Sequence, residues 1–380
     1  MNRIPVFLVA ASLAACTATN NSRDSSRLAP DVASRSHQRH GHSVPVHKKA
    51  IAAILAKAEN HKKRIGRVWG LREIKMPSSH LFVKYSQNYN SRAVIDFETG
   101  SITVETVDRT RRKTSLKDTL ITTILTPDDP RAIELYTAKP NRQAGKPYLF
   151  GLIHDHNDRH VHDKRSAVRY AAYLVNNKIQ QREIKVHGKR TKVYFVNIQM
   201  VDDHQNLRAR RYSKYVNKYA GKFRLRRRLI YAIIQTESNF NPYAVSSAPA
   251  FGLMQIVPRS GGRDAFKKVF NIDRIPSRAF LFNPENNIQL GAAYLNVLYY
   301  QYFAKIHNPS AREYCVIAAY NTGLGNVYSI FAKNRGAAID TINKLTSSQV
   351  YRFLVKKLRY REARDYVFKV VKARPRYKDF

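Results

Sequence analysis

The sequence predicts an α+β fold in which a mixed α+β domain comes first and an all-α domain follows. Two patterns support this prediction. Between about residues 80 and 200, short runs of β-branched and aromatic residues alternate with turn residues, as in antiparallel hairpins. From about residue 205 onward these runs disappear and apolar residues recur at helical spacing. The 380 residues are enough for two domains that each bury a core.

The N-terminus predicts an exported protein with a lipid anchor. Arg3 precedes an apolar run over residues 4–13, which is too short to span a bilayer permanently. Residues 1–15 are therefore interpreted as a signal peptide, and Leu13-Ala14-Ala15-Cys16 resembles a bacterial lipobox. Acyl chains on Cys16 would anchor the protein to a membrane without spanning it. Thr17, where Asp could stand, favours the outer membrane by resemblance to enterobacterial lipoproteins, with the body facing the periplasm.

The N-terminal domain is predicted at residues 49–203, after a tether at 16–48 whose polar composition cannot bury enough surface to fold. The expected elements are, in order, a helix at 49–66, a hairpin at 94–105 with Thr99-Gly100 near its turn, a helix at 115–125, a helix at 165–177 with Asp163 as its N-cap, and a hairpin in which Ile184–Val186 and Val193–Met200 flank His187-Gly188-Lys189. This domain shows no catalytic set of residues, so we expect it to position the protein, contact a partner or bind glycan. The sequence does not specify a protein partner.

The C-terminal domain is predicted at residues 204–380 and consists of helices. These are expected near 205–220, 225–238, 250–257, 285–305, 311–321, 325–332, 336–344, 347–357 and 361–372. The basic residues 374–378 after the last helix are expected to fray.

Glu237 is the candidate catalytic acid. It lies one helical turn beyond Ile233 and Ile234 and shares their apolar face, and Pro242 requires the helix to end soon afterwards. Partial burial and the negative end of the helix dipole both favour the protonated carboxyl, which is the form a general acid needs near neutral pH. The alternative is a structural carboxylate paired with one of the many Arg or Lys residues.

Four further motifs follow the Glu237-Ser238 pair in a fixed order. They are Asn241-Pro242-Tyr243-Ala244-Val245-Ser246, Gly252-Leu253-Met254-Gln255, Ala319-Tyr320-Asn321-Thr322-Gly323 and Glu362-Ala363-Arg364-Asp365-Tyr366-Val367. Together they resemble the lysozyme-like catalytic domain of the soluble-lytic-transglycosylase type, which is related to goose-type lysozyme. Upstream stretches such as Trp69-Gly70 and Ser91–Phe97 resemble the N-terminal domain of the membrane-bound lytic murein transglycosylase C family.

The resemblance implies cleavage of the β-1,4 bond between N-acetylmuramic acid and N-acetylglucosamine in peptidoglycan. Glu237 would protonate the leaving oxygen and then take a proton from the sugar's 6-hydroxyl, which closes a 1,6-anhydro ring. The N-acetyl group would assist in place of a second carboxylate. Substrate-binding roles are implied for Ser246, Met254, Gln255, Tyr320, Asn321, Glu362 and Tyr366. Among these, the Tyr320 hydroxyl is expected to point at Glu237.

Two other functions remain open. A goose-type lysozyme would hydrolyse the same bond, and a non-catalytic lipoprotein would only bind peptidoglycan. Because all the catalytic motifs lie beyond residue 204, the helical domain is expected to fold and to cut peptidoglycan without residues 1–200.

The formal net charge of +40 suits an acidic polymer such as peptidoglycan with its peptide carboxylates. The basic residues are spread along the chain without a nucleic-acid motif, so we expect no nucleic-acid partner. No cofactor is expected. The histidines at 154, 156, 160 and 162 are interrupted by other polar residues and read as a polar loop, not a metal site. With Cys16 lipidated, Cys315 would remain as a buried packing residue.

Overall fold

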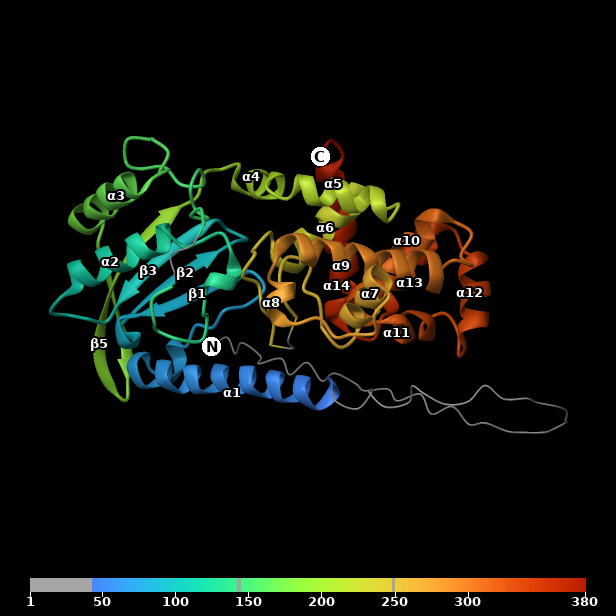
Figure 1. Ribbon diagram of the computed structural model, residues 1–380, viewed down its shortest axis with the longest axis horizontal. Coiled ribbons are helices and arrows are strands. Elements are labelled where there is room, and N and C mark those ends of the chain that lie inside the picture. The colour runs from blue at the N-terminus through green and yellow to red at the C-terminus, as the bar shows by residue number, and fades with distance from the viewer. Residues whose placement is uncertain (1–42, 142–144, 248–249) are drawn as a thin grey trace, which may run out of the picture. The chain divides into compact units, whose positions relative to one another are not determined.

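An antiparallel sheet forms the centre of the N-terminal domain (Figure 1). Its strands are β1 (Leu81–Ser86), β2 (Ser91–Asp96), β3 (Ser101–Thr106), β4 (Gln180–Val186) and β5 (Lys189–Gln199), in the spatial order β1-β2-β3-β5-β4. Both predicted hairpins are confirmed, as the β2–β3 and β4–β5 pairs. Gly100 and Gly188 have φ values of 73° and 82° in their turns, a backbone conformation that glycine adopts without strain.

The computed structural model describes residues 43–141, 145–247 and 250–380. Residues 57–380 form one compact unit, which contains both the sheet and the helices that follow it. The predicted signal peptide, the lipidation site Cys16 and most of the predicted tether lie outside the described residues. Within the described ranges, no helix is long and apolar enough to cross a membrane.

Helices cover both faces of the sheet. Helix α1 (Ser43–Trp69) packs Ile65 and Trp69 against the side chains of Val83 and Tyr85. Residues on the opposite face of β2 and β3 are buried next to α2 (Arg112–Ile124), which in turn packs on α3 (Lys164–Asn177). The predicted N-cap of α3 is confirmed, because the Asp163 carboxylate accepts from the Ser166 N–H at 2.6 Å.

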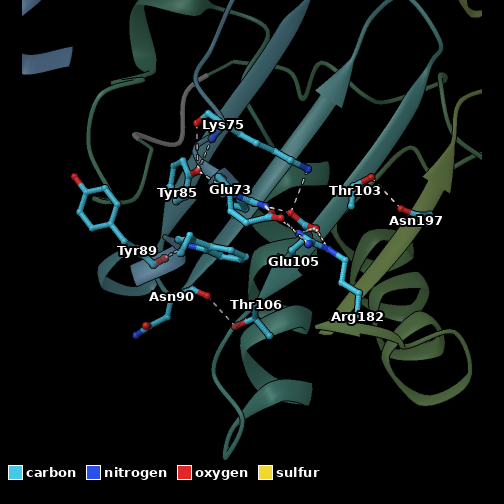
Figure 2. A network of polar contacts seen from close by, with 12 residues as sticks. Glu73, Lys75, Tyr85, Tyr89, Asn90, Thr103, Glu105, Thr106, Arg182 and Asn197 are labelled. Atoms are coloured by element: carbon cyan, nitrogen blue, oxygen red, sulfur yellow. Dashed lines mark hydrogen bonds and ion pairs between the residues drawn. The ribbon is translucent and has the colours of Figure 1, made fainter. Parts of the chain in front are cut away.

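A cluster of ion pairs lies under the sheet, on the face that α1 covers (Figure 2). Glu105 is buried and accepts from Arg92 Nε at 2.5 Å and from Arg182 at 3.0 Å. Glu73 joins Arg182 at 2.7 Å, and Lys75 reaches Glu105 at 3.4 Å. Each buried charge in this cluster has an opposite charge within reach, as the low polarity of a protein interior requires.

The elements described after β5 are helices, so the predicted order of a mixed α+β part and an all-α part is confirmed. They are α4 (His204–Arg210), α5 (Ser213–Lys222), α6 (Arg227–Ser238), α7 (Gly261–Phe270), α8 (Arg278–Leu281), α9 (Pro284–Val297), the π-helical turn η4 (Leu298–Tyr302), α10 (Pro309–Thr322), α11 (Leu324–Ser329), α12 (Arg335–Asn343), α13 (Ser347–Lys357), α14 (Arg361–Ala373) and the 3₁₀ turn η5 (Arg374–Tyr377). Helix α6 packs between α5 and α14, and α10 packs on α13 and α14. Cys315 is fully buried in α10, as predicted.

Two predictions for this part were wrong. Residues 250–257 form successive turns instead of a helix, because Gly252 and Gln255 have left-handed backbones with φ values of 74° and 44°. The residues after α14 do not fray. Tyr377 is buried, its ring stacks on Tyr231 with centroids 5.1 Å apart, and its hydroxyl donates to Gln235 at 2.8 Å.

Candidate active site

Glu237 lies in the last turn of α6, on the face that enters the core. Ile230, Ile233 and Ile234 on this face are fully buried, and Glu237 continues the same stripe at the point where the helix ends. Asn239 ends the helix with a left-handed backbone (φ 48°), and Phe240 follows with φ 60°. The chain therefore turns sharply just after Glu237, and its carboxyl group lies at the helix end, as the sequence predicts.

The partner of the Glu237 carboxyl group is a tyrosine. The Tyr366 hydroxyl of α14 donates to Glu237 Oε1 at 2.8 Å, and Tyr366 is itself buried. Within the described part of the chain, Glu237 forms no ion pair with Lys or Arg. The alternative of a structural carboxylate paired with a cation is therefore not supported.

The surroundings of Glu237 favour its protonated form. Burial is the largest cause that raises its pKa to about 8; the Tyr366 hydrogen bond lowers the pKa in part, and the negative charge of Glu362 contributes to the rise. Glu362 is exposed and precedes Tyr366 by one turn of α14, so the two act on Glu237 from the same helix. At neutral pH the carboxyl group accordingly carries the proton that a general acid donates.

The turns at residues 250–257 form a support beside the end of α6. The Ser238 hydroxyl donates to the Leu253 carbonyl at 2.7 Å, and Tyr320 donates to the Met254 carbonyl at 2.8 Å. The resemblance directed the Tyr320 hydroxyl at Glu237, whereas in the structure Tyr366 makes that bond and Tyr320 fixes the neighbouring turn. At Gly252 a Cβ atom would come within 2.6 Å of the Leu281 carbonyl, so this position needs glycine.

Met254 and Gln255 occupy different surroundings within these turns. The Met254 side chain is fully buried, and its sulfur fills the space left by the missing side chain of Gly291. Gln255 Nε2 donates to the Gly252 carbonyl at 2.9 Å, whereas its Oε1 is buried without a hydrogen-bond partner among the described residues. An unpaired buried acceptor is costly, so Gln255 Oε1 is the atom of this pair that would gain most from a new hydrogen-bond donor.

Ser246 and Asn321 lie in other segments. The Ser246 hydroxyl accepts from the Ala250 N–H at 3.2 Å and so closes the loop before the turns. Asn321 is exposed near the end of α10, just before Gly323 with its φ of 82°. From the sequence both residues were expected to bind substrate, and that expectation stays a prediction.

The N-terminal domain holds the turn that follows Glu237. Arg208 is fully buried and donates to the carbonyls of Asn239 at 2.6 Å and Phe97 at 2.7 Å. The Asn239 side chain donates to the same Phe97 carbonyl at 2.7 Å, and the Tyr148 hydroxyl donates to the Phe240 carbonyl at 3.0 Å. Further links join His80 to Thr236, Asn241 to Ser79 and Tyr243 to Pro127.

These linking residues were missed at the level of sequence. A buried arginine such as Arg208 cannot be told from a surface arginine by its neighbours, and Tyr148 and Asn239 belong to no motif. The only signal was Asn239 itself, since Asn is common at a left-handed helix end.

Comparisons with known proteins agree with this architecture. Residues 47–211 match the family described as the N-terminal domain of membrane-bound lytic murein transglycosylase C, and residues 214–343 match the transglycosylase SLT domain. Proteins named membrane-bound lytic murein transglycosylase C from Yersinia pestis (strain Pestoides F) and Yersinia pseudotuberculosis serotype O:1b are 39% identical over 317 residues, which cover 83% of this chain and 87% of theirs.

Solved structures of two soluble lytic transglycosylases also match. Slt from Pseudomonas aeruginosa is 28% identical with a TM-score of 0.32, and covers 43% of this chain and 23% of its own. The 70 kDa enzyme from Escherichia coli is 27% identical with a TM-score of 0.34, and covers 44% and 24%.

Proposed function

Since this chain belongs to the membrane-bound lytic murein transglycosylase C family, it is a lytic transglycosylase that degrades peptidoglycan, and we propose that Glu237 performs the chemistry as acid and then as base. The observation that carries this proposal is the enclosed carboxyl group with a pKa near 8 and a tyrosine as its partner. A group protonated at neutral pH can donate to the glycosidic oxygen without first taking a proton from water.

In the proposed reaction Glu237 donates one proton and later takes one back. The carboxyl group protonates the oxygen between N-acetylmuramic acid and N-acetylglucosamine as the bond to the muramic acid C1 breaks. The substrate's N-acetyl oxygen stabilises the positive charge at C1, and Tyr366 stabilises the new carboxylate through its hydrogen bond. The carboxylate then takes the proton of the muramic acid 6-hydroxyl, whose oxygen bonds to C1 and closes the 1,6-anhydro ring. Glu237 ends protonated, ready for the next cycle.

The other site residues are proposed to hold the substrate. Gln255 would accept a bond from a sugar through its unpaired Oε1, and Ser246 and Asn321 would bond to the N-acetyl group and to sugar hydroxyls. Met254 and Tyr320 would act indirectly, because they fix the turn that carries Gln255. Exposed Glu362 would position the glycan beside Glu237, and its charge would add to the effect of burial in favouring the protonated form of Glu237.

The mass of the products tests the chemistry. Purified sacculi are digested with the protein and the released muropeptides are weighed. A lytic transglycosylase gives anhydro-muropeptides, which are one water lighter than hydrolytic products and have no reducing end for borohydride. Products that borohydride reduces would instead identify a goose-type lysozyme activity.

We propose that the protein is anchored in the outer membrane by acyl chains on Cys16 and faces the periplasm. The relatives carry the name membrane-bound, and Leu13-Ala14-Ala15-Cys16 resembles a lipobox. The Cys16→Ala variant is expected to lose incorporated fatty acid in metabolic labelling and to leave the membrane fraction. Label retained by the variant would place the anchor elsewhere.

We propose that the two domains, divided near residue 203, work as one catalytic unit. The sequence alone favoured a self-contained helical domain. The hydrogen bonds from Asn239 to the Phe97 carbonyl and from Tyr148 to the Phe240 carbonyl instead favour dependence on the N-terminal domain. A protein without residues 1–200 would leave the Asn239 side chain without its acceptor and the Phe240 carbonyl without its donor, at about 1–3 kcal/mol for each group that stays buried. We expect it to cleave sacculi poorly even where circular dichroism shows helices. Cleavage at the full-length rate would show that the domains are independent.

A further inference from the structure

The N-terminal domain contains a pocket of about 830 Å³ that takes no part in the site around Glu237. Every residue that lines it lies between Arg64 and Asn141. Its walls come from the last turns of α1, the end of β1 with the turn that follows, α2, and residues 137–141. Its volume lies in the range of pockets that bind small molecules and short chain segments.

The charge of this pocket is strongly positive. Arg64, Arg67, Lys84 and Lys139 line it, against Asp118 as the acidic residue. Arg64 lies over the Tyr89 ring at 5.3 Å, which restricts where its guanidinium can point. Such a set of cations favours an anionic ligand, and the carboxylate of Asp118 could pair with an amine of the same ligand.

Lys84 is an unusual wall residue because it is buried. Its ammonium group donates to the carbonyls of Glu134 at 2.7 Å and Thr137 at 3.0 Å. An ammonium has three N–H donors. Among the described residues two of them are used by these carbonyls, so the third remains for a ligand. Burial lowers the pKa of Lys84 to about 8, so this charge is held at a cost that a bound anion would offset.

The turn at the pocket edge is strained. Gln87, Asn88 and Tyr89 have φ values of 50°, 52° and 72°, which non-glycine residues seldom adopt in succession. The turn is nevertheless fixed, because Trp69 donates to the Tyr89 carbonyl at 2.7 Å and Gln87 donates to Ser115. Strain that surrounding contacts maintain is typical of binding sites.

We propose that this pocket binds the stem peptide of peptidoglycan through the peptide's carboxylates, as a second binding site separate from the glycan cleft. The proposal rests on peptidoglycan being the substrate. A stem peptide carries several carboxylates and an amine, which match the pocket's cations and Asp118. The exposed amide group of Asn88 suits its peptide bonds. A concave pocket fits a chain segment, whereas a bilayer surface would need a protruding basic face.

A second site on the same polymer changes how the enzyme meets its substrate. Once a stem peptide is bound in the pocket, binding of the same polymer's glycan near Glu237 becomes an intramolecular event. Its effective concentration is set by the length of polymer between the two sites. The pocket should therefore strengthen attachment to intact sacculi and leave the chemistry at Glu237 unchanged.

The test uses the full-length protein and a sugar-free stem tetrapeptide, L-Ala-γ-D-Glu-meso-diaminopimelate-D-Ala, with binding measured by calorimetry. The pocket variant is Arg64→Glu with Arg67→Glu. The matched control is Lys62→Glu with Lys63→Glu, which makes the same charge change at exposed residues of α1 that do not line the pocket. Loss of charge-assisted hydrogen bonds predicts at least about tenfold weaker binding for the pocket variant and less than about twofold for the control.

Three results would overturn the proposal. They are equal binding by both variants, equal binding of a peptide whose carboxylates are amidated, and no peptide binding while vesicles with anionic lipid bind through the same arginines. Cleavage of peptide-free glycan reports separately on Glu237. If the pocket variant keeps that cleavage but still binds peptide normally, only the second site fails. If Glu237→Gln cleaves normally, only the proposed chemistry fails.

Discussion

Glu105 is buried and Glu237 is half-buried in a chain of formal net charge +40, and their pKa values move in opposite directions. At Glu105, burial favours the protonated form, but the nearby charges of Arg92 and Lys75 outweigh it and the pKa is lowered. At Glu237, burial meets only a neutral hydrogen bond from Tyr366, and the pKa is raised to about 8.

The comparison shows that the partner, and not burial alone, decides what a buried carboxyl group can do. Glu313 in the helical domain is also buried, and its partners are likewise arginines, with Arg226 at 2.6 Å and Arg374. A general acid in so basic a chain requires cations to be kept away from one carboxyl group. Tyr366 meets this requirement, because it donates a hydrogen bond without adding a positive charge.

The largest effect is expected for Glu237→Gln. The amide keeps the shape of the side chain but cannot give or take a proton, so cleavage should fall by about 10²–10⁴-fold or more. Muropeptide release from sacculi measures this, and circular dichroism checks that the variant is folded. Release within a few-fold of the wild-type rate would remove Glu237 from the mechanism.

The same variant should be more stable than the wild type above acidic pH. A pKa raised on folding means that the folded protein holds a proton that the unfolded chain releases, so Glu237 destabilises the fold increasingly between its ordinary pKa and about 8. The ceiling is about 1.4 kcal/mol for each pH unit of that interval, and water reaching the site reduces it. Thermal unfolding at pH 5 and pH 8 should show a gain for Glu237→Gln that is larger at pH 8.

Glu105→Gln should show the opposite pattern, with a loss of stability. The variant leaves fully buried Arg92 with an incomplete set of acidic partners, and breaking a buried pair in this way typically costs about 3–5 kcal/mol. Denaturant unfolding measures the loss. The folded fraction should still give anhydro products, and a variant as stable as the wild type would mean that the cluster does not hold the sheet together.

Tyr366→Phe should reduce activity by a smaller factor and shift its pH dependence. A hydrogen bond to a charged group contributes about 1.5–3 kcal/mol, which corresponds to roughly 10–100-fold in rate. Because this bond lowers the pKa of Glu237, its removal should move the loss of activity at high pH to still higher pH. An unshifted profile would limit Tyr366 to packing.

Glu362→Gln should have the smallest effect, in the other direction. The exposed Glu362 charge raises the pKa of Glu237, so its removal should move the high-pH loss of activity to lower pH. Interactions of exposed charges are worth about 0.2–1 kcal/mol, so the rate at neutral pH should change less than about fivefold. A loss as large as that of Glu237→Gln would identify Glu362 as a second catalytic carboxylate.

Much of the fold could be predicted because its signals are local. The turn glycines at 100 and 188, the cap at Asp163 and the apolar stripe of α6 each act within a few residues of themselves. Helix α7 was missed because Gly261 and Gly262 open it, and glycines weaken a helical pattern. Glycine is needed at position 261 because a larger side chain would contact the ring of Tyr294 in α9. This contact joins two helices and cannot be inferred from the residues next to Gly261 in the sequence.

The candidate site could be predicted in its residues but not in all its contacts. Glu237 and Tyr366 were both named from the sequence, yet the tyrosine that the resemblance directed at Glu237 was Tyr320. Which hydroxyl reaches the carboxyl group depends on how α10 and α14 pack against α6, and this is a matter of tertiary structure. The hydrogen bonds of Arg208 and Tyr148 depend in the same way on the packing of the two domains.

The contacts around Glu237 also have a consequence for the order of folding. Tyr366 lies 129 residues from Glu237, and the bond from Asn239 to Phe97 joins residues 142 apart. Such distant contacts close late, because long loops must be ordered before they are formed. Until then, Glu237 would be an ordinary ionised carboxylate in water, without the proton that cleavage needs. If Glu237 is the catalytic acid that we propose, activity against the cell wall is expected only once the tertiary structure is complete.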